Sequence, residues 1–264
     1  MNKVTDFNKK KNQGEKISMV TAYDYPTAKM IAASAIDAIL VGDSVAMVFH
    51  GYANTTFATR EMMALHTSAV ARGADDKFIV TDMPFLSLER GEAYLFDTLD
   101  LFIKAGARSV KMEGGEFIFS QIEKTIKAGI PVMGHLGLTP QTINQLGSYK
   151  VQGKKDEEAQ KIIAQARELE KLGVFALILE CVPGALAAHL RDELSIPVIG
   201  IGAGPEVDGQ ILVIDDLLGR SNSGYPKFVR QYGNTFELGL NCLNQYHQDI
   251  QANSFPSSQE SYLC

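Results

Sequence analysis

The sequence predicts a single (β/α)8 TIM barrel, an α/β fold, from three observations. Eight short apolar runs rich in β-branched residues each stop at Gly, Pro, Asp or Glu. Stretches with helical spacing separate most of these runs, and strands that alternate with helices form a parallel sheet. The chain has 264 residues, which is the usual size of eight strand–helix units. A doubly wound open sheet is the structural alternative.

The predicted elements follow the chain in a regular order. The strands are expected at Ser18–Thr21, Ala38–Val41, Phe78–Thr81, Ser109–Met112, Pro131–Gly134, Ala176–Leu179, Pro197–Ile201 and Ile211–Ile214. Helices are expected at about 25–35, 59–72, 92–105 and 117–127. The clearest helix has Asp156 as its N-cap, one apolar face, and an end at Gly173.

Composition limits the possible class of protein. A formal net charge of -6 gives no attraction to a phosphate backbone or an anionic lipid surface, so neither nucleic acid nor membrane is an expected partner. The apolar runs fall far short of the roughly 20 residues that span a bilayer. The N-terminus lacks an apolar signal segment, which indicates a cytoplasmic location. Cys181, Cys242 and Cys264 lack Cys-x-x-Cys spacing, which argues against a disulfide framework or a thiolate zinc site.

The chain shows no linker long enough to separate two domains. We therefore expect one domain over residues 1–264, with the barrel at about 15–232 and a C-terminal helix and loose tail at about 233–264. The segment from Gln248 to Cys264 is polar and weakly patterned, so it is expected to be loose.

Polar side chains follow the predicted strands where functional groups of such a barrel belong. They are Tyr23 and Asp24 after strand one, Asp43 and Ser44 after strand two, Asp82 after strand three, Lys111 and Glu113 in strand four, His135 after strand five and Glu180 after strand six. The barrel predicts that they meet at the carboxyl-terminal face. Any one acidic residue here is as well explained as the N-cap of the following helix.

The residue types indicate a reaction class. Asp43, Asp82 and Glu113 offer hard oxygen ligands, which suit Mg²⁺ better than zinc. A 2-oxo acid chelates such an ion through its keto and carboxylate oxygens, and the ion then stabilises an enolate. Glu180 is the candidate base, because its apolar strand is expected to raise its pKa toward the working range.

Two further residues have structural alternatives. Lys111 projects to the same side as Glu113 if the strand period of two holds, and it can then pair with a substrate carboxylate. A structural ion pair of Lys111 with Glu113 or Asp82 is the alternative. His135 is either a site residue or a hydrogen-bonded core histidine.

The ordered motifs resemble those of the ketopantoate hydroxymethyltransferase family over roughly residues 15–232. The matching segments are Val20–Asp24, Val41–Ser44, Lys111–Gly115, Pro131–Gln141, Tyr149–Gly153, Leu179–Pro183, Ile196–Gly204, Asp208–Val213 and Pro226–Phe228. Two positions depart from the family pattern. Ser148 replaces a glycine, and Val45-Ala46 replaces Leu-Gly, which puts the loop geometry in question.

The resemblance implies transfer of a hydroxymethyl group from 5,10-methylenetetrahydrofolate to 3-methyl-2-oxobutanoate (2-oxoisovalerate). The product is 2-dehydropantoate, in pantothenate and coenzyme A biosynthesis. It also implies Mg²⁺ ligands at Asp43, Asp82 and Glu113, a proton acceptor at Glu180, and homo-oligomers, commonly decamers. The substrate contacts that it implies are Asp43, Ser44, Asp82, Lys111 and His135.

Two other functions compete with this interpretation. Lyases and mutases of the phosphoenolpyruvate mutase and isocitrate lyase type share the barrel and an enolate, but their Lys-Lys-Cys-Gly-His segment is absent from this chain. A barrel that has lost catalysis and serves as a scaffold is the second alternative, although a scaffold has no need of this many ionisable groups at one face.

Overall fold

The computed structural model describes residues 1–222 and 224–262, so Cys264 lies outside the described residues. The chain divides into two compact units, Met1–Val213 and Ile214–Cys264. All eight strands belong to the first unit. The expectation of one domain over all 264 residues, with a barrel reaching about residue 232, stays a prediction.

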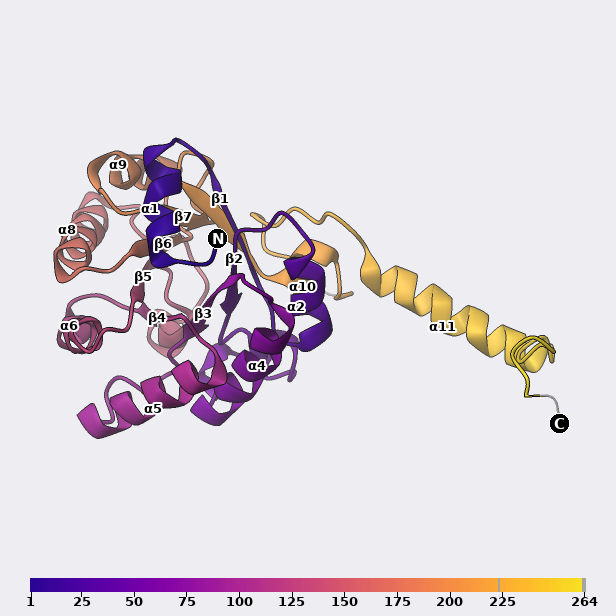
Figure 1. The fold of residues 1–264 in the computed structure, drawn as a ribbon. Coiled ribbons are helices and arrows are strands. Elements are labelled where there is room, and N and C mark those ends of the chain that lie inside the picture. The colour runs from indigo at the N-terminus through magenta and orange to yellow at the C-terminus, as the bar shows by residue number, and fades with distance from the viewer. Residues whose placement is uncertain (223, 263–264) are drawn as a thin grey trace. The chain divides into compact units, whose positions relative to one another are not determined.

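The first unit is a closed barrel of eight parallel strands that pair in chain order, with β8 closing onto β1 (Figure 1). The strands are β1 (Ile17–Thr21), β2 (Ala38–Val41), β3 (Phe78–Asp82), β4 (Ser109–Glu113), β5 (Val132–Gly137), β6 (Ala176–Glu180), β7 (Val198–Ile201) and β8 (Gly209–Leu212). The predicted fold class is therefore confirmed, and the open-sheet alternative is wrong because β1 and β8 pair directly.

Helices surround this barrel (Figure 1). They are α1 (Val4–Asn12), α2 (Tyr25–Ala32), α4 (Arg60–Gly73), α5 (Glu92–Ala105), α6 (Phe119–Lys127), α8 (Asp156–Leu172) and α9 (Gly184–Glu193). Shorter elements lie in the loops, namely α3 (Val45–Val48), α7 (Ile143–Leu146) and the 3-10 turns η1 (Thr55–Phe57), η2 (Glu116–Ile118) and η3 (Pro140–Thr142). Asp156 is the first residue of α8 rather than its N-cap, which is Lys155.

The eighth strand differs from its predicted bounds. It covers Gly209–Leu212, and Ile214 begins α10 (Ile214–Leu218). Gly209 pairs with both Ile17 and Ile199, and a Cβ on it would lie 2.4 Å from the Ile17 carbonyl oxygen. A search for β-branched runs misses a strand that begins at a glycine, yet only glycine permits this close approach.

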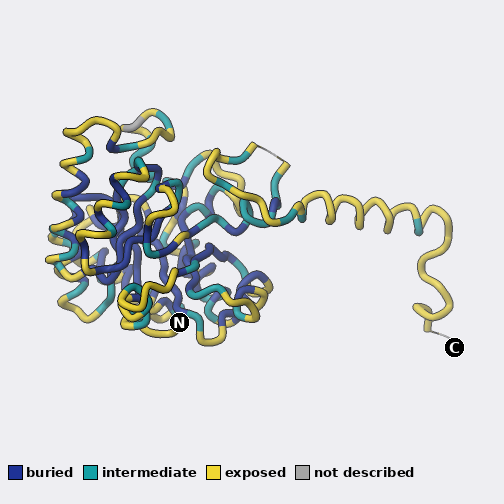
Figure 2. Tube along the Cα trace, turned by 90° about the horizontal axis from the view of Figure 1, so that it is seen from above, coloured by how far each residue is buried: buried dark blue, intermediate teal, exposed yellow. Residues whose placement is uncertain are grey.

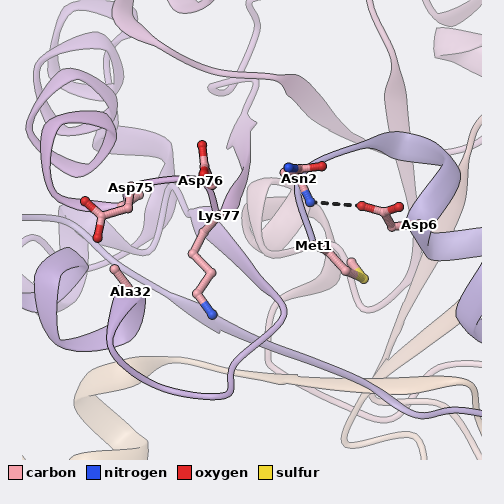
Figure 3. A pocket seen from close by; sticks show the side chains of 8 residues that line it. Met1, Asn2, Asp6, Ala32, Asp75, Asp76 and Lys77 are labelled. Carbon is pink, nitrogen blue, oxygen red and sulfur yellow. Dashed lines mark hydrogen bonds between the residues drawn. The ribbon is translucent and has the colours of Figure 1, made fainter.

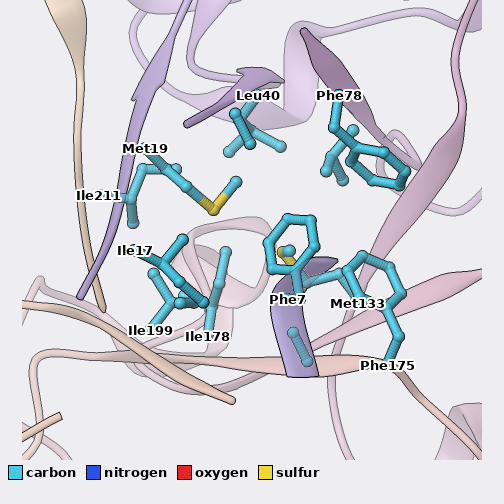
Figure 4. Close-up of a cluster of buried hydrophobic side chains, with 13 residues drawn as sticks. Phe7, Ile17, Met19, Leu40, Phe78, Met133, Phe175, Ile178, Ile199 and Ile211 are labelled. Carbon is cyan, nitrogen blue, oxygen red and sulfur yellow. The ribbon is translucent and has the colours of Figure 1, made fainter. Parts of the chain in front are cut away.

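The barrel interior is filled with apolar side chains, and its strands are the most buried part of the unit (Figure 2). At the amino-terminal ends of the strands, Phe7 of α1 packs its ring edge-on against Phe78 and Phe175, with centroids 5.3 and 5.1 Å away (Figure 4). Helix α1 therefore closes this end of the barrel.

A cavity of about 470 Å³ lies at the same end, where Ala74–Lys77 joins α4 to β3 (Figure 3). Met1, Asn2 and Asp6 line its other side. None of the predicted site residues lines it, because they follow the opposite ends of the strands.

The second unit contains α10 and α11 (Thr235–Gln251). The Asn234 side chain caps α11 by accepting a hydrogen bond from the Glu237 N–H. Residues 248–251 are thus helical, and the prediction of a loose segment was wrong for them. No helix in the described part of the chain is long and apolar enough to cross a membrane.

We expect Phe7→Ala to lower the free energy of unfolding by about 3–5 kcal/mol, because it removes a fully buried ring at the closed end of the barrel. Urea unfolding followed by circular dichroism measures the effect. Phe117→Ala, at a ring that is 58% exposed, is the matched control and should change stability by no more than about 0.5 kcal/mol. Equal stability of the two variants would contradict the role of Phe7.

Candidate active site

Strand register brings the predicted polar residues side by side at the carboxyl-terminal end of the barrel. Asp82 of β3 is in register with Lys111 of β4, and Glu113 is in register with His135 of β5. Lys111 and Glu113 are two residues apart and so project to the same face. Their side chains do meet, with Lys111 Nζ 3.9 Å from Glu113 Oε2.

Asp43 and Asp82 are joined through the backbone. The Asp43 N–H donates to Asp82 Oδ2 at 3.0 Å, and Lys111 Nζ lies 3.0 Å from Asp82 Oδ1. All three side chains are buried. Lys111 therefore forms the structural ion pair that was one of its two predicted roles.

A histidine links the cluster to the candidate base. His135 Nδ1 is 3.3 Å from Glu113 Oε2, and His135 Nε2 is 3.3 Å from Glu180 Oε2. The side chains of Glu113 and His135 are only 2% exposed, whereas that of Glu180 is 16% exposed. Glu180 thus stands at the boundary between the closed cluster and the barrel mouth.

Gln141 crosses the mouth from the loop after β5. Its backbone N–H donates to Glu113 Oε1 at 2.8 Å, and its side-chain amide donates to Asp43 Oδ2 at 2.8 Å and to the Met83 carbonyl at 2.9 Å. These bonds connect the loop to Glu113 at the end of β4, and to Asp43 and Met83 in the segments that follow β2 and β3.

The pKa shifts of the cluster follow first from burial and then from the neighbouring charges. Burial, followed by the neighbouring carboxylates Asp82 and Glu113, raises the pKa of Asp43 well above its usual value. Burial also raises the pKa of Asp82, against the opposing effect of Lys111. Burial acts to lower the pKa of Lys111, but the surrounding carboxylates outweigh it and raise the pKa.

Glu113 and His135 shift in opposite directions. Burial acts to raise the pKa of Glu113, but the hydrogen bond from His135 and the nearby positive charges lower it. Burial and Lys111 act to lower the pKa of His135, but its hydrogen bonds to Glu113 and Glu180 raise it to about 8. The imidazole thus lies between the two glutamates, and its Nδ1 is also 3.2 Å from Lys111 Nζ.

The chemistry of the carboxylates fits Mg²⁺, although their arrangement is not that of a formed metal site. In the described ranges, no group of three or more His, Cys, Asp or Glu side chains has a metal-holding arrangement. Asp43, Asp82 and Glu113 come from three neighbouring strands and are hard oxygen donors. Burial raises the pKa of both Asp43 and Asp82, and a bound divalent cation would favour their ionised forms.

Two other predicted polar residues make separate contacts. Ser44 follows Asp43 directly, and its hydroxyl lies 2.8 Å from the Tyr23 hydroxyl. Asp24 does not join the cluster. It caps α2 by accepting the Thr27 N–H at 2.7 Å, so for this residue the N-cap alternative was the right one.

The loop departures from the family pattern cause little strain. Ser148 is not among the non-glycine residues with positive φ, whereas its neighbour Gly147 has φ of 71°. A Cβ at position 148 therefore meets no left-handed backbone.

Cys181 does have positive φ, 47°, directly after Glu180. Burial raises the pKa of its thiol to about 11, so it does not compete as a nucleophile.

The sequence did not single out Gln141 or Tyr149 as site residues. Burial, followed by the charges of Glu180, Asp43 and Glu113, raises the pKa of Tyr149. Both lie in the long loop after β5, the strand that contains His135 and ends at Gly137. Loops at that face carry function in barrels. The position of this loop at the carboxyl-terminal face was the sequence signal that could have identified them.

This chain is similar to known proteins over nearly its whole length. The profile of the ketopantoate hydroxymethyltransferase family matches residues 1–258. The 3-methyl-2-oxobutanoate hydroxymethyltransferase of Legionella pneumophila (strain Lens) is 49% identical over 261 residues, which cover 98% of this chain and 100% of that protein. The protein of the same name from Bdellovibrio bacteriovorus (strain ATCC 15356 / DSM 50701 / NCIMB 9529 / HD100) is 47% identical, covering 99% of this chain and 100% of that protein.

Solved structures agree with the fold. The phosphonopyruvate hydrolase in complex with oxalate and Mg²⁺ superposes with a TM-score of 0.63 at 11% identity, covering 98% of this chain and 93% of that one. At this identity the likeness concerns the barrel alone. The full-length profile match, together with identities near one half, shows that this chain is an enzyme that belongs to the ketopantoate hydroxymethyltransferase family.

Proposed function

We propose that this enzyme transfers a one-carbon unit from 5,10-methylenetetrahydrofolate to 3-methyl-2-oxobutanoate, forming 2-dehydropantoate for pantothenate and coenzyme A biosynthesis. With water as the third reactant, the balanced products are 2-dehydropantoate and tetrahydrofolate. The names of its relatives support the acceptor and the hydroxymethyl group. The observation that carries the proposal is the continuous set of contacts from Asp43 through Asp82, Lys111, Glu113 and His135 to Glu180.

We further propose that Asp43, Asp82 and Glu113 hold Mg²⁺. When bound, the ion polarises the keto group of the oxo acid, which acidifies the adjacent carbon and stabilises an enolate. Lys111 supplies a buried positive charge beside the same carboxylates and is placed to pair with the acid's carboxylate. Ser44, held next to Asp43 and Tyr23, is a further contact for the acid.

Glu180 is proposed to remove the C3 proton of 3-methyl-2-oxobutanoate. It is the most exposed carboxylate of the contact set, so a substrate reaches it from the mouth, and His135 fixes one of its oxygens. The carbanion equivalent then forms the new carbon–carbon bond with the folate methylene group.

A turnover assay with 3-methyl-2-oxobutanoate, methylenetetrahydrofolate and Mg²⁺ tests the overall reaction. We expect 2-dehydropantoate and tetrahydrofolate in equal amounts, and loss of turnover in excess chelator that returned Mg²⁺ restores. Turnover that survives the chelator would remove the metal from the proposal. No product under any of these conditions would overturn the proposed reaction.

We expect Glu180→Gln to lose the exchange of the C3 proton into deuterated water, because an amide does not accept the proton. NMR of 3-methyl-2-oxobutanoate with enzyme and Mg²⁺, but without folate, measures this half-reaction alone. The control is Glu123→Gln on the outer helix α6, which should exchange at the wild-type rate. Unchanged exchange in Glu180→Gln would remove this residue from the role.

We propose a homo-oligomer, as the family resemblance implies, with a decamer as the expected size. Phe236, Leu240, Leu243 and Ile250 are exposed on α11 at spacings of three, four and seven residues, which is the pattern of a helix-packing seam. Light scattering is expected to give a multiple of 28.8 kDa, and Leu243→Glu is expected to reduce it. A wild-type mass of one chain would refute the assembly.

A further inference from the structure

The segment that carries Gln141 is fastened at both of its ends to the end of β6. The Leu138 N–H donates to the Glu180 carbonyl at 2.8 Å, and the Gln152 N–H donates to the Cys181 carbonyl at 2.8 Å. Between these anchors, the chain runs through η3 and α7. The segment therefore starts and finishes beside the candidate base.

Gln141 is the residue that carries this segment across to the opposite carboxylates. Its three hydrogen bonds, of 2.8, 2.8 and 2.9 Å, reach Glu113, Asp43 and the Met83 carbonyl. Both donors of its side-chain amide are thus used, one on a carboxylate and one on the backbone after β3. The backbone bond to Met83 fixes the direction of the amide, so its donor to Asp43 has little freedom.

The carboxylate oxygens of the cluster fall into two groups according to their partners. Protein N–H groups hold Asp43 Oδ2, Asp82 Oδ2 and Glu113 Oε1. Asp82 Oδ1 and Glu113 Oε2 instead face the ammonium group of Lys111. One oxygen of each of these two carboxylates is therefore orientated by an N–H, while the other is directed toward positive charge.

We propose that Gln141 is a positioning residue that holds the carboxylates of Asp43 and Glu113 in place for a divalent cation and ties the segment 138–152 over them. This inference rests on the proposed Mg²⁺ site. It gives a role to Gln141, which the sequence analysis did not assign to the site. Outer-shell hydrogen bonds of this kind orient metal ligands, and their loss typically weakens metal binding by about 10- to 100-fold.

The side-chain chemistry at position 141 is specific. A glutamate would add a fourth carboxylate to a cluster that already raises the pKa of Asp43 and Asp82. An asparagine keeps the amide but is one methylene shorter, so its donor falls short of Asp43 while the backbone bond to Glu113 remains. A methionine keeps the length and removes the donor.

Calorimetric titration of the folded, metal-free enzyme with Mg²⁺ tests the proposal. We expect Gln141→Met to bind Mg²⁺ about 10- to 100-fold more weakly than the wild type. Gln141→Asn, the second variant, should show a loss of similar size because its amide does not reach. The matched control is Gln145→Met, an exposed glutamine in the same segment, which should keep wild-type affinity.

Hydrogen–deuterium exchange of the metal-free proteins gives a readout that needs no metal. Faster exchange across 138–152 in Gln141→Met, but not in Gln145→Met, is the expected result. Faster exchange with unchanged Mg²⁺ affinity would show that Gln141 only fastens the loop, and this would overturn the positioning role.

Asp43→Ala separates failure of this inference from failure of the proposed metal site. If the wild type binds Mg²⁺, Asp43→Ala loses binding and both Gln141 variants keep it, then only the role of Gln141 is overturned. If the wild type itself binds no Mg²⁺, the proposed metal site fails, and the positioning role fails with it.

Discussion

The organisation of this site depends on one buried positive charge among several buried carboxylates. Lys111 lies within 4 Å of both Asp82 and Glu113, and all three are buried, so each charge relies on the others for compensation. Burial is the main cause that raises the pKa of Asp43 and Asp82, and for Asp43 the neighbouring carboxylates raise it further.

The barrel makes such a concentration of charge possible. Parallel strands in register place Asp82 beside Lys111 and Glu113 beside His135 without any long-range adjustment of the backbone. The apolar interior and the buried ring of Phe7 stabilise the opposite end, where no predicted site residue lies. Stability is thus concentrated at one end of the strands, and charge at the other.

The same geometry separates the proposed roles of two chemically similar groups. Glu113 is almost fully buried and is held by His135 and Gln141, which suits a fixed ligand. Glu180 shares the same histidine but retains exposure, which suits a group that exchanges a proton with a substrate. Burial and hydrogen bonding therefore distinguish the two glutamates, although their position at a strand end is the same.

The sequence by itself determined the barrel, the order of its strands and the residues Asp43, Asp82, Lys111, Glu113, His135 and Glu180 at one face, because apolar β-branched runs and the residues at their ends are local properties. Only the tertiary structure decided which of the polar residues after strands belong together. It assigned Asp24 to a helix cap, started β8 at Gly209 and brought Gln141 onto Asp43 from a distant loop. These outcomes depend on contacts between residues far apart in the chain, which no local pattern encodes.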